Sequence, residues 1–296
     1  MRRLLIVGCG DVALRAAPLL SRRYRLYGLS HRPDQRPALR EHGITPIPGD
    51  LDDRRLLRRI AGFADEILHL APPPPRGQLD SRTAHLVAAL GSRGSLPRRL
   101  LYISTSGVYG DCRGALVRET RRINPGTDRA RRRVDAERRL RAFQRRTAVR
   151  VSILRVPGIY ASDRLPLARL KAGTPALAHE EHAYSNHVHA DDLASICAAA
   201  LRKGRPGRIY HAVDESMLTM GEYFDAVADA FDLPRPPRVD WEVARASLSP
   251  ELLSFMRESR RLSDARLKKE LGVRLRYPTV RNALEQLSRP AARAVR

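Results

Sequence analysis

The chain has 296 residues, of which 43% are hydrophobic and 29% are charged, and its formal net charge is +23. The composition is that of an ordinary globular protein and excludes collagen-like, disulfide-framework and wholly disordered chains. No apolar run approaches the roughly 18 residues of a membrane-spanning helix, so we expect neither a membrane span nor a targeting segment. The three cysteines are far apart and show no CxxC spacing, which fits a reducing cytoplasm.

Arginine supplies nearly all of the positive charge, because only Lys171, Lys203, Lys268 and Lys269 are lysines among the 55 basic residues. Such an excess can mark a nucleic-acid surface or a preference for anionic ligands. A surface that binds single-stranded nucleic acid requires aromatic residues among its basic residues, and the basic runs of this chain lack them. The arginines are spread along the whole sequence, which favours a coding bias together with an anionic small-molecule ligand. Nucleic acid is not an expected partner.

Short apolar runs that predict strands alternate with segments of helical spacing through the first half of the chain. The expected strands are Arg3–Gly8, Tyr24–Leu29, Ile44–Pro48, Glu66–Leu70, Arg99–Ser104 and Val149–Val156. Helices are expected at Val12–Leu20, Asp53–Ile60 and Ser81–Leu90. This alternation predicts an α/β protein with a Rossmann-type, doubly wound parallel sheet.

A glycine-rich turn follows the first strand and opens the first helix. It consists of Gly8, Cys9, Gly10, Asp11, Val12 and Ala13, which match the pattern GxGxxA. Gly8 permits a tight turn, Gly10 lets the backbone approach a pyrophosphate, and Ala13 keeps helix and sheet close. The turn predicts a dinucleotide site, although a merely compact turn is the alternative. We expect the Asp11 carboxylate to point away from phosphates or to cap the helix.

The end of the second strand predicts which dinucleotide is bound. An acidic residue there would accept hydrogen bonds from the ribose of NAD, but the chain has Ser30, His31 and Arg32. Arg32 can make charge-assisted contacts to a 2′-phosphate, so NADP is favoured, NAD remains open, and a merely solvated arginine is the alternative. Other expected cofactor contacts are Asp50, Leu51, Leu70, Ala71, Pro72 and Pro157.

Several short motifs resemble the extended short-chain dehydrogenase/reductase superfamily, in its NAD-dependent epimerase/dehydratase group. They are Leu101–Gly110, Glu119 with Asn124 and Pro125, Leu154–Tyr160, Val188–Ala194, and Arg261–Ser263 with Leu271 and Gly272. The resemblance implies a cofactor domain at 1–156 with a returning segment near 184–213. It also implies a smaller substrate-binding lobe formed by 157–183 and 214–296. Homodimer formation is left open.

By this resemblance, the hydroxyl that polarises the substrate oxygen falls on Thr105, with Ser106 as a neighbour able to replace it. Alternatively, these hydroxyls satisfy backbone groups at a strand end. The YxxxK motif of the family would fall on Arg129 and Arg133, and no tyrosine lies between Tyr109 and Tyr160. A guanidinium does not deprotonate in proteins, so Arg129 cannot replace a tyrosine as a base. Arg133 can supply the positive charge of the lysine.

The remaining histidines offer a weaker signal. His179 and His182 have the spacing HxxH, but Pro175 precedes them and no helical pattern carries them, so no metal site is expected. Either could instead replace the missing acid/base. We therefore expect an NADP-preferring oxidoreductase or epimerase for an anionic carbonyl or sugar-nucleotide-like substrate. The alternative is a catalytically inactive NADP-binding regulator or scaffold.

Overall fold

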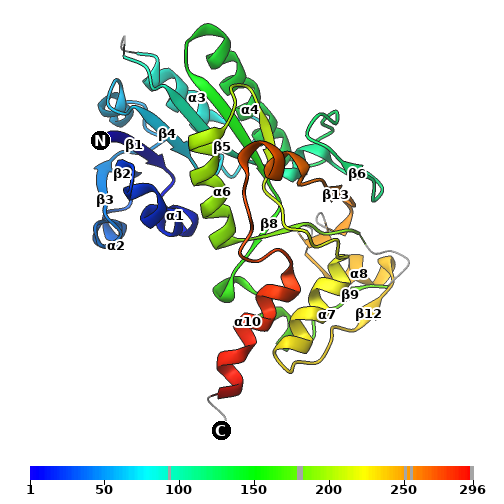
Figure 1. The fold of residues 1–296 in the computed structure, drawn as a ribbon. Helices are drawn as coiled ribbons and strands as arrows, with labels where there is room; N and C mark the ends of the chain where they lie inside the picture. The colour runs from blue at the N-terminus through cyan, green and yellow to red at the C-terminus, as the bar shows by residue number, and fades with distance from the viewer. Residues whose placement is uncertain (93–94, 179–182, 250–251, 254–255, 294–296) are drawn as a thin grey trace.

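The computed structural model describes residues 1–92, 95–178, 183–249, 252–253 and 256–293 (Figure 1). At its centre is a seven-stranded sheet in the order β11-β7-β5-β4-β1-β2-β3, with every neighbouring pair parallel. The strands are β1 (Arg2–Val7), β2 (Tyr24–Ser30), β3 (Ile44–Pro48), β4 (Glu66–His69), β5 (Arg99–Thr105), β7 (Arg150–Val156) and β11 (Ile209–His211). This order confirms the predicted Rossmann-type sheet.

Helices cover both faces of the sheet because its strands are apolar on both sides. In β1, Leu4 and Ile6 pack on one face, and Leu5 and Val7 pack on the other, and all four are fully buried. The first face is covered by α1 (Asp11–Ser21), α2 (Arg36–Glu41) and α6 (Ala190–Lys203). The opposite face is covered by η2 (Leu56–Ile60), α3 (Ser81–Leu90) and α4 (Asp128–Arg146). The sheet is therefore doubly wound, as expected.

A smaller group of elements lies beyond the carboxyl ends of the strands (Figure 1). It has its own core, in which Tyr160, Tyr223, Phe224 and Tyr277 are buried. Its elements are β8 (Gly158–Tyr160), α5 (Leu167–Lys171), β9 (Ala176–Leu177), β10 (His187–His189), α7 (Met220–Ala230), β12 (Arg238–Val239), α8 (Trp241–Ser247) and α10 (Val280–Arg293). Within the described ranges, every helix is too short or too polar to cross a membrane.

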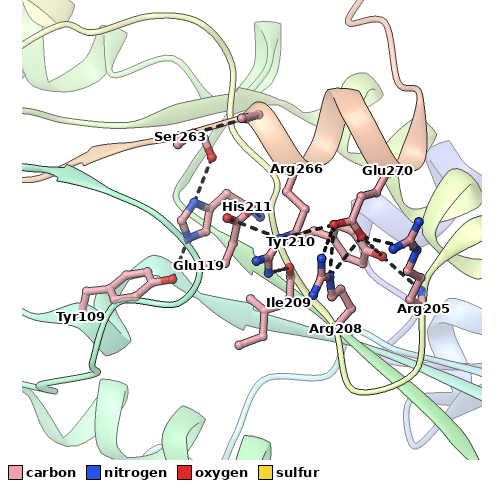
Figure 2. Close-up of polar contacts among 11 residues, drawn as sticks. Tyr109, Glu119, Arg205, Arg208, Ile209, Tyr210, His211, Ser263, Arg266 and Glu270 are labelled. Atoms are coloured by element: carbon pink, nitrogen blue, oxygen red, sulfur yellow. Dashed lines mark hydrogen bonds and ion pairs between the residues drawn. The ribbon is translucent and has the colours of Figure 1, made fainter.

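The chain returns from the smaller lobe to the edge of the large sheet. Strand β13 (Arg261–Leu262) pairs with β6 (Leu116–Val117), and the following π-helix η6 (Leu267–Leu271) buries both of its terminal leucines in the core of the large sheet. Figure 2 shows the polar contacts that hold this return, including a salt bridge of 2.5 Å between Arg208 and Glu270. Residues 261–271 thus pack on the cofactor side, although the expected smaller lobe includes them. The lobe boundaries stay a prediction.

Candidate functional site

The glycine turn between β1 and α1 leaves open space in front of the helix. Gly8 has φ = +96°, and a Cβ atom on it would lie 2.4 Å from the backbone nitrogen of Ala71, so only glycine fits. A Cβ atom on Gly10 would meet nothing within 4 Å. Gly10 is also the N-cap of α1 and has no side chain to satisfy the first N–H groups of the helix. The turn therefore has the shape and the donors for an anion at the helix N-terminus.

The acidic residue in this turn is neutralised by arginines. The Asp11 carboxylate accepts a hydrogen bond from Nε of Arg15 at 2.8 Å and lies 3.2 Å from Nη2 of Arg164. Arg15 also reaches Asp191 on α6 at 2.7 Å. Asp11 does not cap α1. Because arginines balance its negative charge, the carboxylate repels a nearby phosphate less strongly.

A cavity of about 490 Å³ runs from this turn along the carboxyl ends of β1, β2, β3 and β4. It brings together all the expected cofactor residues except Pro157: Gly8, Cys9, Gly10, Asp11, Val12, Ala13, Ser30, His31, Arg32, Asp50, Leu51, Leu70, Ala71 and Pro72. Segments that are far apart in the sequence thus meet at one edge of the sheet, which is where open α/β sheets bind their ligands.

At the end of β2, Ser30 and Arg32 differ in how freely they can meet a ligand. Ser30 is 3% exposed, and its hydroxyl donates to the Arg32 carbonyl at 3.1 Å, so it mainly fixes the turn. The Arg32 guanidinium is exposed and pairs with Asp34 at 3.3 Å. Exposed pairs of this kind contribute little free energy, so Arg32 can exchange Asp34 for a phosphate.

One wall of this cavity is held by a residue that the sequence pattern does not indicate. Arg82 on α3 makes a two-point contact to Asp52, with Nη2 2.6 Å and Nε 2.9 Å from the carboxylate oxygens. Its Nη1 also donates to the Pro72 carbonyl at 3.3 Å. Arg82 therefore ties the loop after β3 to the loop after β4. No motif could have indicated it, because it lies in an ordinary amphipathic helix.

A second cavity, of about 620 Å³, contains the expected catalytic residues. Thr105, Ser106, Arg129 and Arg133 all line it, and so does Pro157. Pro72 lines both cavities, so the two are adjacent. The expected cofactor residues and the expected catalytic residues thus line two adjacent cavities at the carboxyl end of the sheet, which together are called the cleft.

Thr105 ends β5 and begins the short helix η3 (Ser106–Tyr109). Its Oγ1 accepts a hydrogen bond from the backbone N–H of Gly107 at 3.2 Å, which fixes the side chain and leaves its own proton to donate. Ser106 is buried, with 4% of its surface exposed. Thr105 is the better placed of the two hydroxyls to hydrogen-bond an oxygen atom in the cavity, since it is only partly buried.

Arg129 and Arg133 lie one turn apart on α4. Arg133 donates from Nη1 to the Tyr102 hydroxyl at 3.0 Å and to the Ile103 carbonyl at 2.8 Å, so it is fixed against β5. Arg129 lies at the start of the helix, where partial desolvation lowers the pKa of its guanidinium and Glu258 opposes this effect. The cationic Arg133 nearby lowers the pKa of Arg129 further. Both side chains bring positive charge to the cleft.

The cavity also has lining residues that the sequence analysis missed. They include the phenols of Tyr160, Tyr184 and Tyr223, and the neighbouring pair of Glu258 and Arg260, whose charged atoms are 2.8 Å apart. Burial raises the pKa of Tyr160 and of Tyr223 well above the ordinary value. Tyr160 ends the family-like motif Leu154–Tyr160, whereas Tyr184, Tyr223, Glu258 and Arg260 lie in segments that no motif indicates.

The histidines have mostly structural roles. His69 is fully enclosed, hydrogen-bonds Thr83 at 3.0 Å, and has its pKa lowered to about 3 by burial. His189 accepts from the Asp191 N–H and so caps α6. The expected alternative acid/base residues, His179 and His182, lie outside the described residues. Among the residues that the structure does describe, no group of three or more His, Cys, Asp or Glu side chains could hold a metal ion.

Comparisons with known proteins agree with this geometry. Residues 14–212 match the model of the NAD dependent epimerase/dehydratase family. No curated protein matches the chain. A functionally unknown conserved protein from Silicibacter pomeroyi is 30% identical, with a TM-score of 0.83 over 98% of this chain and 99% of that one.

Two enzymes of known activity share the fold at lower identity. A UDP-glucose 4-epimerase from Thermotoga maritima, solved with UDP-glucose, is 14% identical, with a TM-score of 0.78 over 99% of this chain and 100% of that one. A UDP-glucuronic acid 4-epimerase from Bacillus cereus, solved with NAD, is 14% identical, with a TM-score of 0.75 over 97% of this chain and 96% of that one. The family match covers well over half of the sequence, and the chain therefore belongs to the NAD-dependent epimerase/dehydratase family of oxidoreductases and epimerases.

Proposed function

We propose that the protein is an NADP-preferring oxidoreductase or epimerase that acts on an anionic carbonyl or nucleotide-sugar-like substrate. The observation that carries the proposal is the junction of two cavities at Pro72. One contains the glycine turn and the other contains Thr105 and the α4 arginines. A dinucleotide lying along the first cavity would direct its reactive end into the second.

The residues of the first cavity fit a dinucleotide. Gly10 has open space in front of its Cα, and Gly8 brings the turn against the end of β4. These features suit a pyrophosphate at the N-terminus of α1. When bound, a nicotinamide dinucleotide supplies or accepts the hydride in the reaction. Related folds give precedents, since the Bacillus cereus epimerase was solved with NAD.

The preference for NADP rests on Arg32. No carboxylate stands at the end of β2 to accept hydrogen bonds from the ribose of NAD, and the first acid beyond it, Asp34, already pairs with Arg32. A 2′-phosphate would replace that exposed pair with a charge-assisted contact to the guanidinium. Ser30 is committed to the backbone of the turn and contributes less.

In the second cavity, Thr105, Arg129 and Arg133 have different roles in the proposed reaction. Thr105 donates a hydrogen bond to the reacting oxygen, and its fixed contact with Gly107 keeps it in place. Arg129 stabilises negative charge that develops on that oxygen, because a guanidinium stays protonated. Arg133, fixed on Tyr102, adds a second positive charge to the lining of the cavity. The cationic lining also favours an anionic substrate.

The catalytic tyrosine of the family is missing from this site, because its position in the motif falls on Arg129. Tyr160 and Tyr223 line the cavity, but burial raises the pKa of each, so neither ionises near neutral pH. We propose that water in the open cleft delivers the proton, with a histidine from 179–182 as the alternative donor. A guanidinium that stays charged is compatible with either source.

Titration calorimetry with NADP and with NAD tests the cofactor part of the proposal, and NADP is expected to bind more tightly. Purified protein with NADPH is then screened against aldehydes and ketones for loss of NADPH absorbance. With NADP it is screened against nucleotide sugars for the epimerised sugar, because epimerisation returns the hydride and leaves the cofactor unchanged. Failure to bind either dinucleotide would overturn the proposal. Binding without turnover of any compound would favour a regulator that senses NADP.

A further inference from the structure

A third cavity, of about 510 Å³, shares no lining residue with the two cavities of the cleft. Its wall is formed by the segment 119–123, by α4, by the end of β7, and by the edge of the sheet at β11, with Arg266 from the returning chain. Figure 2 shows part of this wall, where Arg208 and Arg266 lie beside Ile209. Nothing in the proposed reaction uses it.

The lining of this cavity is strongly cationic. Seven arginines and two glutamates line it, and the lining has no aromatic side chain. The two carboxylates are already engaged within the protein. Glu137 accepts from Arg155 at 2.7 Å and from the Ser104 hydroxyl at 2.7 Å, and Glu119 accepts from the backbone N–H of His211. Glu137 offsets the charge of Arg155, and Glu119 lies 3.8 Å from Arg266, but two carboxylates cannot balance seven lining guanidinium groups.

Arg155 contributes a buried positive charge to the wall of this cavity. Its side chain is only 3% exposed, and its Nε and Nη2 both bind Glu137. Its Nη1, however, has no hydrogen-bond partner in the structure. A buried donor without a partner costs free energy, more so when it is charged. The guanidinium carbon lies 4.7 Å from the ring centroid of Tyr109, and its buried positive charge adds to the positive potential of the cavity that Arg155 helps to line.

The more exposed arginines of the cavity are also available. Arg121, Arg122, Arg138 and Arg141 make no ion pair with any carboxylate in the part of the chain that the structure describes. Their neighbours differ, since Arg139 on α4 pairs with Asp135 at 2.7 Å and Arg208 pairs with Glu270. Charged faces that serve only solubility commonly mix both signs, but these four arginines line the same cavity without a carboxylate partner in that described part of the chain.

We infer that this cavity binds a phosphorylated small molecule with two or more negative charges, at a site separate from the catalytic cleft. Guanidinium groups match phosphate oxygens by paired, charge-assisted hydrogen bonds, and several of them together favour a multiply charged ligand. The hollow shape and the absence of aromatic lining disfavour single-stranded nucleic acid, which requires surfaces for base stacking.

The test uses inorganic pyrophosphate as the probe, titrated into the whole protein by calorimetry. Arg121→Gln with Arg141→Gln removes two unpaired lining charges without touching the cleft. The matched control is Arg145→Gln with Arg146→Gln, which removes two charges from the same helix outside this cavity. All titrations are repeated in a Gly10→Val background, which blocks binding of pyrophosphate at the glycine turn.

The lining double variant is expected to weaken pyrophosphate binding about tenfold or more, and the control less than about twofold, since only the former loses charge-assisted contacts. Equal weakening in both would mean a diffuse basic surface and would overturn the site. Loss of all binding in the Gly10→Val background would also overturn it, while leaving the proposed cofactor site intact. A short single-stranded DNA that binds more tightly than pyrophosphate and is lost with the lining double variant would reject a small-molecule ligand.

Discussion

The Arg155 guanidinium and the Glu137 carboxylate form a two-point ion pair near the end of β5, with distances of 2.7 and 3.1 Å and with 3% and 4% of their side-chain surfaces exposed. Ser104 donates to the same carboxylate at 2.7 Å, one residue before Thr105. The pair therefore connects α4 and β7 to the end of β5. This connection fixes the relative positions of the residues that line the second cavity.

Glu137→Leu is expected to lower the free energy of unfolding by about 3–5 kcal/mol, because it leaves the buried Arg155 charge without a partner. Asp229→Ala is the control, since the Asp229–Arg235 pair is more than half exposed on both sides. It should cost less than about 1 kcal/mol. Urea unfolding measures both. Similar costs for the two variants would contradict a structural role for the buried pair.

Gly10→Val is expected to fold normally and to lose dinucleotide binding. The backbone at Gly10 is extended, and a Cβ atom there meets no protein atom within 4 Å. The added side chain would occupy the space proposed for the pyrophosphate. Gly8→Ala provides a contrast, since it would place a methyl group against Ala71 and should lower stability. Thermal unfolding together with calorimetry separates the two effects, and unchanged affinity in Gly10→Val would place the dinucleotide elsewhere.

Arg32→Ala should weaken NADP binding about tenfold and change NAD binding less than about twofold, because only NADP loses a charge-assisted contact. Arg40→Ala is a suitable control, since Arg40 is exposed on α2 and does not line the cavity. The two dissociation constants are measured by calorimetry for each variant. A preference for NADP that survives in Arg32→Ala would assign the discrimination to another residue.

Arg129→Ala, and Thr105→Ala combined with Ser106→Ala, should each lower kcat by about 10²-fold and leave the affinity for NADP nearly unchanged, because these groups act on the transition state. Arg131→Ala is the control on the same helix, since Arg131 pairs with Asp128 and does not line the cavity. Steady-state kinetics on any substrate found by screening gives the result. Activity that is indifferent to all three positions would reject this mechanism.

Asp214 is expected to make stability depend on pH. Burial raises the pKa of its carboxyl group to about 8, although hydrogen bonds from Ser216 oppose the rise. The same group in the unfolded chain has a pKa of about 3.9, so between these values the folded state holds a proton that the unfolded state has released. The free energy of unfolding should therefore fall as the pH rises from about 4 to about 8.

Asp214→Asn cannot ionise and should remove this part of the pH dependence. In the parent protein the Asp214 carboxylate accepts a hydrogen bond from the Ser216 N–H at 2.9 Å, and the amide oxygen of Asn can still accept it. Urea unfolding at several pH values across this window compares the two proteins. Parallel curves for the variant and the parent would show that Asp214 does not carry the effect.

The sequence predicts the fold and most of the cofactor cavity because both depend on local patterns. Apolar runs that end in glycine or small polar residues mark strand ends, and parallel strands bring their carboxyl ends to one edge. All the expected residues from Gly8 to Pro72 therefore line one cavity. The helix expected at Asp53–Ile60 is only partly present, since the structure has a short 3-10 helix at Leu56–Ile60 instead.

The rest of the site depends on contacts between segments that no local pattern connects. Arg82 reaches the first cavity from α3, and Arg260 reaches the second cavity from the chain that returns to the large sheet. Arg260 is fixed there by the Gly110 carbonyl at 2.7 Å, 150 residues away in sequence. Such contacts follow from tertiary packing, and only the folded structure contains that information.

The run Pro72–Pro75 lines the junction of the two cavities, and an arginine holds the chain at each side of it: Arg82 donates to the Pro72 carbonyl, and Arg132 donates to the Gly77 carbonyl. Proline has a fixed φ and no N–H group, so this wall offers ligands apolar contact but no backbone donor. Its conformational freedom is lost when the chain folds and does not have to be lost again on binding. Ordering of this wall therefore adds no entropic cost when the proposed cofactor or substrate binds.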